Sequence, residues 1–295
     1  MTPDVFTALA AILKKRSGLI LTADKGYLVE SRLGPVAHKF GLPNVDALIA
    51  ALIKGSEPLA RAVTEAMTTN ETSFFRDSRP FDMFRNEILP RIIERKAATK
   101  SLRIWSAAAS TGQEAYSLAM ILRDESARLP GWKIEIVGTD ISEAALQQAR
   151  AGVFSHFEVQ RGLPAQMLVK HFEKIDGSWR VAAPIRAMVQ FRNFNLLDNL
   201  APLGSFDVVF CRNVLIYFDV ETKAQVLHAI TRRMADQGVL ILGGAETVLG
   251  ITDQLEPVSG SRGLYRSVAK AAGNSSNAPA QASSFLRPSI AAAAA

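Results

Sequence analysis

Apolar residues near the start of the chain recur at the spacing of helices. Leu9 and Leu13 lie one helical turn apart, which is typical of the buried face of an amphipathic helix. A second helical pattern begins after Asn44 or Asp46, and either side chain can cap the first turn of a helix. Glycine and proline residues separate the two patterns. We therefore predict a small all-helical domain over residues 1–67.

The next segment, residues 68–101, is predicted to form a linker and a bridging helix. Ser78 and Pro80 suit the start of this helix, and its apolar positions continue to Ile92. The helix would connect the helical domain to a region with a different pattern.

From Leu102 onward, short apolar runs alternate with helical patterns. One long helix is predicted from about Val220 to Gln237, with Asp219 as its cap and Gly238 just past its end. Strands that alternate with helices form mainly parallel sheets with helices on both faces, so this region is predicted to be α/β. Its predicted strands are residues 102–105, 134–137, 189–191, 208–211 and 239–242.

Two segments depart from this alternation. Within residues 152–191, approximately, the dipeptide Asp176-Gly177 separates two runs suited to strands, and such a dipeptide favours a tight hairpin turn. We predict a small antiparallel β insertion there. Residues 269–295 are mostly Ala, Ser, Asn and Pro, which bury too little apolar surface to offset the entropy of ordering, so we predict a disordered tail.

The composition is that of a globular protein, with 48% hydrophobic residues in a chain of 295. The single cysteine, Cys211, excludes an internal disulfide framework and suits a reducing compartment, and we expect it to be a small buried hydrophobic residue. The apolar run 8–13 is followed by basic residues, which is the wrong order for a secretory signal. No run approaches the roughly 20 apolar residues of a membrane-spanning helix. We predict a cytoplasmic protein without direct membrane insertion.

Positive charge concentrates in residues 76–103, which hold eight basic and four acidic residues in a chain of net charge +6. From charge alone, a solvated helix face with intrahelical pairs accounts for this segment. The alternative is a cationic surface that attracts an acidic partner. The chain lacks an Asn-Pro-Pro-aromatic motif and a Pro-Cys pair, and its acids are interspersed with its bases. We therefore predict no nucleic-acid partner.

Three loops at the ends of predicted strands are candidates for a cofactor site, because ligands of such sheets bind at the carboxyl ends of the strands. The loop of residues 105–114 is rich in small side chains, but Gly112 is its only glycine, which is a poor match to dinucleotide-binding loops. Asp140 ends the next strand and can accept the hydroxyls of a ribose or cap the following helix; both interpretations stay open. Residues 194–198 supply polar atoms and leucines that can flank an adenine ring. Together the loops favour S-adenosylmethionine over NAD.

Two further segments make the pattern specific. Thr68 to Asp77 reads TTNETSFFRD, and Cys211 to Phe218 reads CRNVLIYF. With the loops above, in this order, the sequence closely resembles the chemotaxis receptor methyltransferases from residue 1 to about residue 268. The resemblance implies a Rossmann-like methyltransferase sheet over residues 102–268, with a small N-terminal all-helical domain and a small antiparallel β insertion.

The resemblance also implies the cofactor, S-adenosyl-L-methionine, with S-adenosyl-L-homocysteine as product. Arg76 would face the methionine carboxylate, and Asp140 the ribose. Glu114 would either meet the ammonium group or hold the loop, and these alternatives stay open. Gln113 and Ala115 stand where glutamate and proline are common in the family, and neither change is expected to abolish binding. The implied cofactor-binding residues are Asn70, Thr72, Arg76, Glu114, Asp140, Asn195, Leu196, Arg212 and Asn213.

The implied activity is O-methylation of glutamate side chains of methyl-accepting chemotaxis receptors, which tunes sensory adaptation. Since a glutamate carboxylate with a pKa of about 4.3 is already ionised at neutral pH, the reaction needs no general base. We expect Tyr217 and an arginine of the basic segment, Arg91, to orient that carboxylate. The protein is expected to be a monomer, and its four histidines lie in separate predicted elements, so no metal site is predicted. A non-catalytic module that binds S-adenosylmethionine or the receptor is the alternative function.

Overall fold

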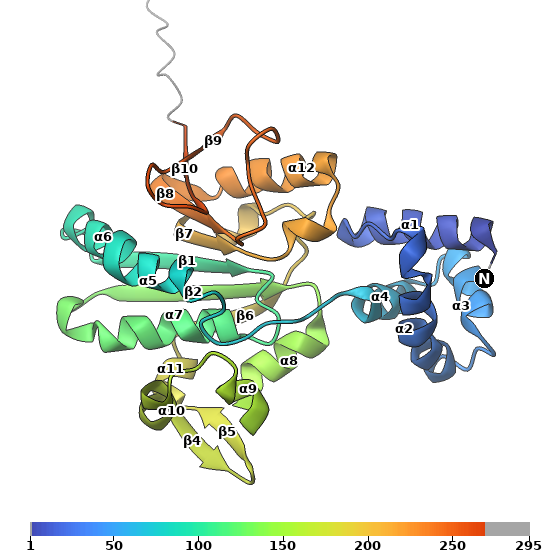
Figure 1. The fold of residues 1–295 in the computed structure, drawn as a ribbon, viewed down its shortest axis with the longest axis horizontal. Coiled ribbons are helices and arrows are strands. Elements are labelled where there is room, and N and C mark those ends of the chain that lie inside the picture. Colours follow the sequence, from blue (N-terminus) through green and yellow to red (C-terminus); the bar gives the residue numbers. More distant parts are fainter. Residues whose placement is uncertain (1, 269–295) are drawn as a thin grey trace, which may run out of the picture.

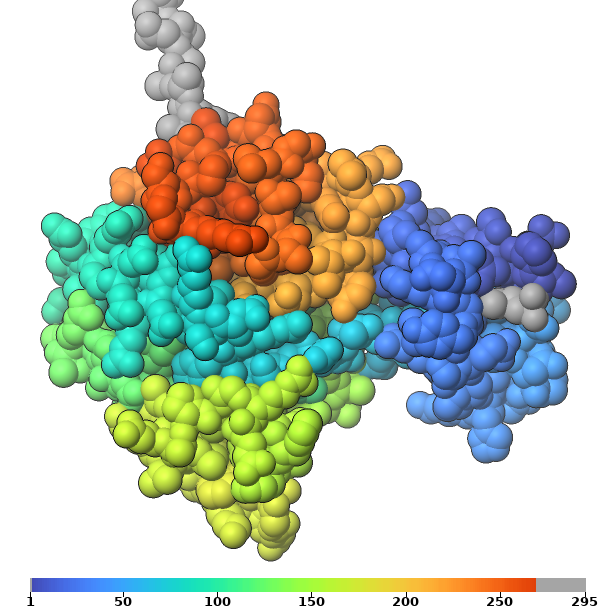
Figure 2. All heavy atoms as spheres, viewed as in Figure 1, coloured from blue at the N-terminus to red at the C-terminus, as the bar shows by residue number. Residues whose placement is uncertain are grey.

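A computed structural model describes residues 2–268, which form a helical lobe beside a larger sheet-containing body with a projecting insertion (Figures 1 and 2). The prediction for residues 269–295 lies outside the described residues. None of the helices within residues 2–268 is long and apolar enough to cross a membrane.

The helical lobe packs around its own hydrophobic core. Leu9 and Leu13 are fully buried in this core, as the periodicity predicts. Asn44 is the residue that caps the third helix, because its side-chain oxygen accepts a hydrogen bond from the Ala47 N–H at 2.8 Å. The helices of the lobe are α1 (Pro3–Ser17), α2 (Gly26–Lys39), α3 (Val45–Ile53) and α4 (Glu57–Met67).

The body is built on a seven-stranded mixed sheet. All five predicted apolar runs are strands, and they pair in parallel. The last two strands were not predicted, and they run antiparallel to their neighbours at one edge. In spatial order the strands are β6 (Val189–Asn193), β2 (Lys133–Asp140), β1 (Ser101–Ala107), β7 (Phe206–Cys211), β8 (Met234–Leu242), β10 (Leu264–Ser267) and β9 (Leu255–Pro257).

Helices cover both faces of this sheet, so its central strands are buried on both sides (Figure 1). Val208 and Phe210 of β7 pack into one core with helix α7 (Gln113–Asp124). Val209 and Cys211 alternate with them along the strand and pack into the core on the other face, with helix α12 (Val220–Thr231). Cys211 is fully buried, as predicted. Helix α8 (Glu143–Ala151) connects β2 to the insertion.

The bridging helix is divided, where the sequence predicts one continuous helix. It consists of α5 (Arg79–Met83), a π-helical turn (Phe84–Ile88) and α6 (Leu89–Arg95). In the π turn, the Leu89 N–H bonds to the Phe84 carbonyl. Because Pro90 has no N–H to donate and its ring crowds the preceding turn, the wider turn lets the helix continue past it.

The predicted end of the last long helix is wrong. Helix α12 ends at Thr231, not Gln237, and Met234 starts β8, where it pairs with Phe206. Asp219 does cap the helix, through a 2.8 Å bond from the Thr222 N–H. Strand β8 contains a bulge where it pairs with β7, and Gly238 lies in it. The backbone is tightly folded there, because a Cβ on Gly238 would lie 2.9 Å from the Ala235 carbonyl oxygen. Gly238 therefore serves a tight bend within the strand rather than a helix end.

The insertion contains the predicted antiparallel hairpin. Strands β4 (Phe172–Ile175) and β5 (Ser178–Val181) are joined by Asp176 and Gly177, whose φ values of 35° and 77° are those of a tight hairpin turn. A third strand completes the small sheet. The other elements of the insertion are β3 (Val153–Phe154), α9 (His156–Gln160), α10 (Ala165–His171) and α11 (Ala183–Arg186).

We predict opposite effects of alanine at two uncrowded glycines. A Cβ on Gly177 or on Gly26 would meet nothing within 4 Å, but Gly177 has φ +77° and Gly26 has φ −54°. Gly177→Ala should lower the free energy of unfolding by about 1 kcal/mol, because alanine disfavours the left-handed backbone conformation of this residue. Gly26→Ala should raise it by about 0.5 kcal/mol. Urea unfolding measures both, and a loss of stability in both variants would contradict the account.

Candidate functional site

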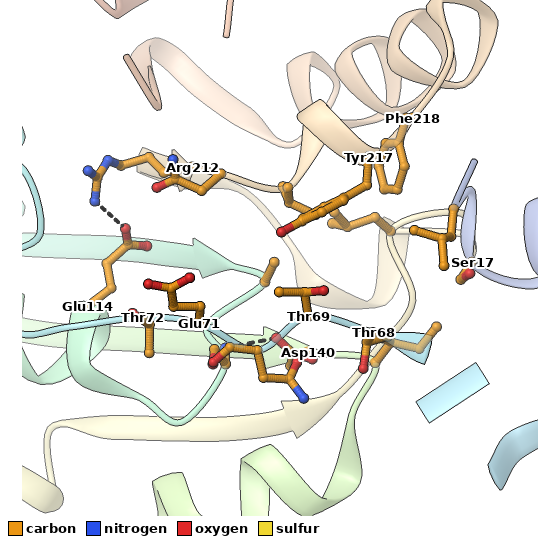
Figure 3. A pocket seen from close by; sticks show the side chains of 18 of the residues that line it. Ser17, Thr68, Thr69, Glu71, Thr72, Glu114, Asp140, Arg212, Tyr217 and Phe218 are labelled. Atoms are coloured by element: carbon orange, nitrogen blue, oxygen red, sulfur yellow. Dashed lines mark hydrogen bonds and ion pairs between the residues drawn. The ribbon is translucent and has the colours of Figure 1, made fainter. Parts of the chain in front are cut away.

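A pocket lies at the carboxyl ends of β1, β2 and β7, where the strand order reverses between β1 and β7 (Figure 3). Its empty space, with the open mouth included, is about 940 Å³. Loops after neighbouring strands meet here because parallel strands end at the same edge. Ten of the predicted site residues line it: Asn70, Thr72, Arg76, Glu114, Asp140, Asn195, Leu196, Arg212, Asn213 and Tyr217.

Arg91 does not lie at this pocket, and its predicted role is corrected. Helix α6 precedes β1 and therefore lies at the amino ends of the strands, opposite the pocket. On the same helix, Arg95 donates to the Gln237 carbonyl near the start of β8. Arg91 lines a separate, open hollow on that side of the molecule. It is not placed to orient a substrate at the pocket.

Among the described residues, no ion pair joins two side chains of the basic segment. Several of its side chains are paired with acids of other elements: Arg85 with Glu125 at 2.7 Å, Lys96 with Asp207 at 2.8 Å and Arg103 with Glu135 at 2.8 Å. The segment therefore ties the bridging helix and β1 to the body.

Asp140 ends β2 with a buried carboxyl group that faces the pocket. Its Oδ2 accepts from the Ser110 N–H at 2.8 Å, and its Oδ1 accepts from the Ser142 N–H at 2.9 Å. Burial raises the pKa of Asp140, and these two hydrogen bonds oppose the rise. Ser142, not Asp140, is the residue whose side chain caps α8. The carboxyl group has lone pairs left for a ligand in the pocket.

Arg212, directly after β7, joins three segments of the pocket wall. Its Nη1 donates to Glu114 at 2.9 Å, and its Nη2 donates to Asp77 at 2.6 Å and to the Arg76 carbonyl at 2.9 Å. The other oxygen of Glu114 accepts from Ser106 at 2.8 Å, so Glu114 does hold the loop. The Nε of Arg212 is buried without a partner among the described residues. Figure 3 shows the Arg212–Glu114 pair at one end of the pocket and Phe218 at the other.

Glu246 is a structural residue of the site that the sequence analysis missed. Its buried carboxylate accepts four backbone N–H groups, those of Asn213, Val214, Leu215 and Gly243, at 2.7 to 3.0 Å. Asn213 has φ +58°, a strained value for a residue other than glycine, and these bonds hold it. Glu246 lies in the loop after β8, four residues past Leu242, a position that gives no sequence signal of this role.

The helical lobe also lines the pocket, which the sequence did not predict. Ser17 and Leu19 contribute to the wall. The Asn195 side chain donates to the Arg16 carbonyl at 2.6 Å, and the Ile20 N–H donates to the Tyr217 carbonyl at 2.9 Å. These bonds connect the lobe to the loops after β6 and β7.

Tyr217 is half-buried, and its hydroxyl end points into the pocket (Figure 3). Three carboxyl groups and two guanidinium groups line the pocket, those of Glu71, Glu114 and Asp140 and of Arg76 and Arg212. The wall therefore suits a ligand that combines positive charge with a carboxylate and with hydroxyl groups.

Comparison with known proteins gives matches along nearly all described residues. Residues 70–264 match the family model of the CheR methyltransferase, SAM binding domain, and residues 4–68 match that of the CheR methyltransferase, all-alpha domain. A chemotaxis protein methyltransferase of Vibrio parahaemolyticus is 40% identical over 256 residues, covering 85% of this chain and 92% of that protein. Chemotaxis protein methyltransferase 1 of Pseudomonas aeruginosa is 40% identical over 266 residues, covering 88% of this chain and 97% of that protein.

We predict that Glu246→Gln weakens the fold at the site. The amide nitrogen would face backbone N–H groups that now donate to a carboxylate, so the free energy of unfolding should fall by about 2 kcal/mol. Urea unfolding measures this fall. Glu221→Gln, on the exposed side of α12, is the matched control and should have little effect. Equal stability of the two variants would show that the carboxylate does not hold this loop.

Proposed function

This chain belongs to the CheR family of S-adenosylmethionine-dependent chemotaxis methyltransferases, and we propose that it methylates glutamate side chains of chemotaxis receptors. The observation that carries the proposal is the pocket, which gathers Asp140, Arg76 and Tyr217 around one open cavity. Family membership supports methyl transfer as the class of reaction, and the lining of the pocket indicates which residues take part in it.

The residues of the pocket fit the cofactor. When bound, S-adenosylmethionine supplies a methyl group activated by a positively charged sulfur. Asp140 would accept hydrogen bonds from the ribose hydroxyls, and Arg76 would bind the methionine carboxylate. Glu114, bonded to Ser106 and Arg212, would hold the wall of the site in place. Polar and apolar groups from three segments would complete the site: Asn70, Thr72, Asn195, Leu196, Arg212 and Asn213.

The acceptor proposed here needs orientation rather than deprotonation. A glutamate side chain is ionised at neutral pH, and no histidine is among the residues that line the pocket. Catalysis by this chain would then consist of holding the acceptor carboxylate in line and excluding water around it. The Tyr217 hydroxyl makes no hydrogen bond to another described residue, so it is available to donate to that carboxylate.

We propose that the reaction takes place in the cytoplasm, on the cytoplasmic helices of the receptors, with the protein acting as a monomer. The helical lobe and the insertion stand on two sides of the body (Figure 1). An open mouth of the pocket would admit the acceptor side chain.

Labelled methyl transfer to receptors tests the function. The full chain is incubated with S-adenosylmethionine carrying a labelled methyl group and with receptor-containing membranes, and alkali then releases the label from a methyl ester as methanol. Wild-type protein should produce alkali-labile label. Asp140→Ala should bind S-adenosylhomocysteine at least about tenfold more weakly, because the ribose loses a charged acceptor. Asp253→Ala, an exposed position away from the pocket, is the control. Cofactor binding without transfer would instead indicate a non-catalytic module.

We predict that Tyr217→Phe acts mainly on the acceptor. Loss of a hydrogen bond to a charged carboxylate should lower kcat/KM for the receptor by about tenfold or more. Affinity for S-adenosylhomocysteine, measured by calorimetry, should change much less. A variant that loses cofactor affinity but keeps kcat would show that the hydroxyl faces the cofactor and not the acceptor.

A further inference from the structure

Among residues 2–268, Arg76 has no carboxylate partner where it lines the pocket, although two acids are close to it in the chain. Its Nη1 donates to the Glu71 backbone carbonyl at 2.9 Å. The acid directly after it, Asp77, is paired with Arg212 at 2.6 Å. The carboxylate of Glu71 is paired with Arg161. Each neighbouring acid is therefore held by a different arginine, and the Arg76 guanidinium keeps donors free.

Arg161 comes from the β insertion, in the loop after α9. The insertion lies directly against the segment that contains Glu71, as the neighbouring cyan and yellow-green surfaces show (Figure 2). Gly162 has φ +90°, and a Cβ there would lie 2.1 Å from the Phe74 carbonyl oxygen. Only glycine permits this close backbone approach. The backbone of Arg161 is thus fixed against the pocket segment.

The alternative partner of Glu71 is Arg76. Its guanidinium already bonds to the carbonyl of Glu71, so rotation of the Glu71 side chain would bring the carboxylate towards it. Arg161 is the first cause, and Arg76 a further cause, of the lowered pKa of Glu71. Both charges of the Glu71–Arg161 pair are about half exposed, with side-chain exposures of 57% and 46%. Without Arg161, the nearest strong attraction left for the Glu71 carboxylate is Arg76.

We propose that Arg161 is a positioning residue that draws the Glu71 carboxylate away from Arg76, which leaves the Arg76 guanidinium open to the carboxylate of a ligand. The inference rests on the proposed function and extends it, because it gives the insertion a part in ligand binding. The carboxylate belongs either to the amino-acid part of the cofactor or to the acceptor glutamate. In either case Glu71 acts as an internal competitor when its arginine is missing.

A double-variant experiment on the full chain tests the inference. Calorimetry measures binding of S-adenosylhomocysteine and of methylthioadenosine, which lacks the amino-acid part, and labelled transfer gives KM for the receptor. Arg161→Ala should weaken one carboxylate-dependent step by about three- to fivefold, the size expected for release of an exposed ion pair. Arg161→Lys should keep most of the wild-type affinity, because lysine can still pair with Glu71. The double variant Arg161→Ala with Glu71→Gln should also recover most of the wild-type affinity, because a neutral amide does not compete for Arg76.

The pattern of losses identifies the ligand. Weaker binding of S-adenosylhomocysteine, with methylthioadenosine unaffected, assigns the cofactor carboxylate; a raised KM for the receptor alone assigns the acceptor. Arg266→Ala, which removes an exposed ion pair to Glu256 elsewhere, is the matched control. Unchanged binding and KM in Arg161→Ala would overturn the inference, as would a double variant as weak as the single one, which indicates a structural role. Since wild-type binding and transfer are measured alongside, either result leaves the proposed function standing.

Discussion

The buried guanidinium of Arg212 is the interaction on which the pocket depends. It bonds to Glu114 after β1 and to Asp77 and the Arg76 carbonyl in the segment before the bridging helix, and it follows β7 itself. A buried ion pair adds little net stability because both charges lose their hydration, but removing one partner costs about 3–5 kcal/mol. Its value here is positional, since three segments far apart in sequence are held in one arrangement.

Two carboxyl groups extend the same principle to the neighbouring loops. Asp140 and Glu246 each bind backbone N–H groups, so they fix the path of the main chain rather than another side chain. Backbone donors are set by the fold and lose little entropy when they bond. The result is a rigid floor at the carboxyl ends of the strands. Tyr217 and the helical lobe form another part of the pocket wall.

Where local pattern decides structure, the sequence was sufficient. The five central strands are apolar runs because both faces are covered, and Asp176-Gly177 specifies its own turn. The end of α12 was predicted wrongly because Met234 continues the helical spacing of apolar residues. In the structure Met234 is the first residue of a bulged strand, β8. Strands β9 and β10 were missed because they are short, at three and four residues, and lie at an edge. These errors arise from tertiary contacts, which the spacing of apolar residues within one segment does not indicate.

The candidate site follows the same division. Ten predicted residues meet because each lies in a motif at the carboxyl end of a strand or in the segment that packs there. Arg91 was misplaced because a basic segment close in sequence to Arg76 runs to the opposite end of the sheet. Ser17, Leu19 and Glu246 reach the site through contacts between distant segments, and their residue types carry no signal of this.

A crystal structure of the protein with S-adenosylhomocysteine tests the central claim most directly. We expect the nucleoside in the cavity at the end of β2, with the ribose hydroxyls on Asp140, the amino-acid carboxylate on Arg76 and the sulfur open towards Tyr217. A ligand seated elsewhere, or one bound with its ribose away from Asp140, would contradict it.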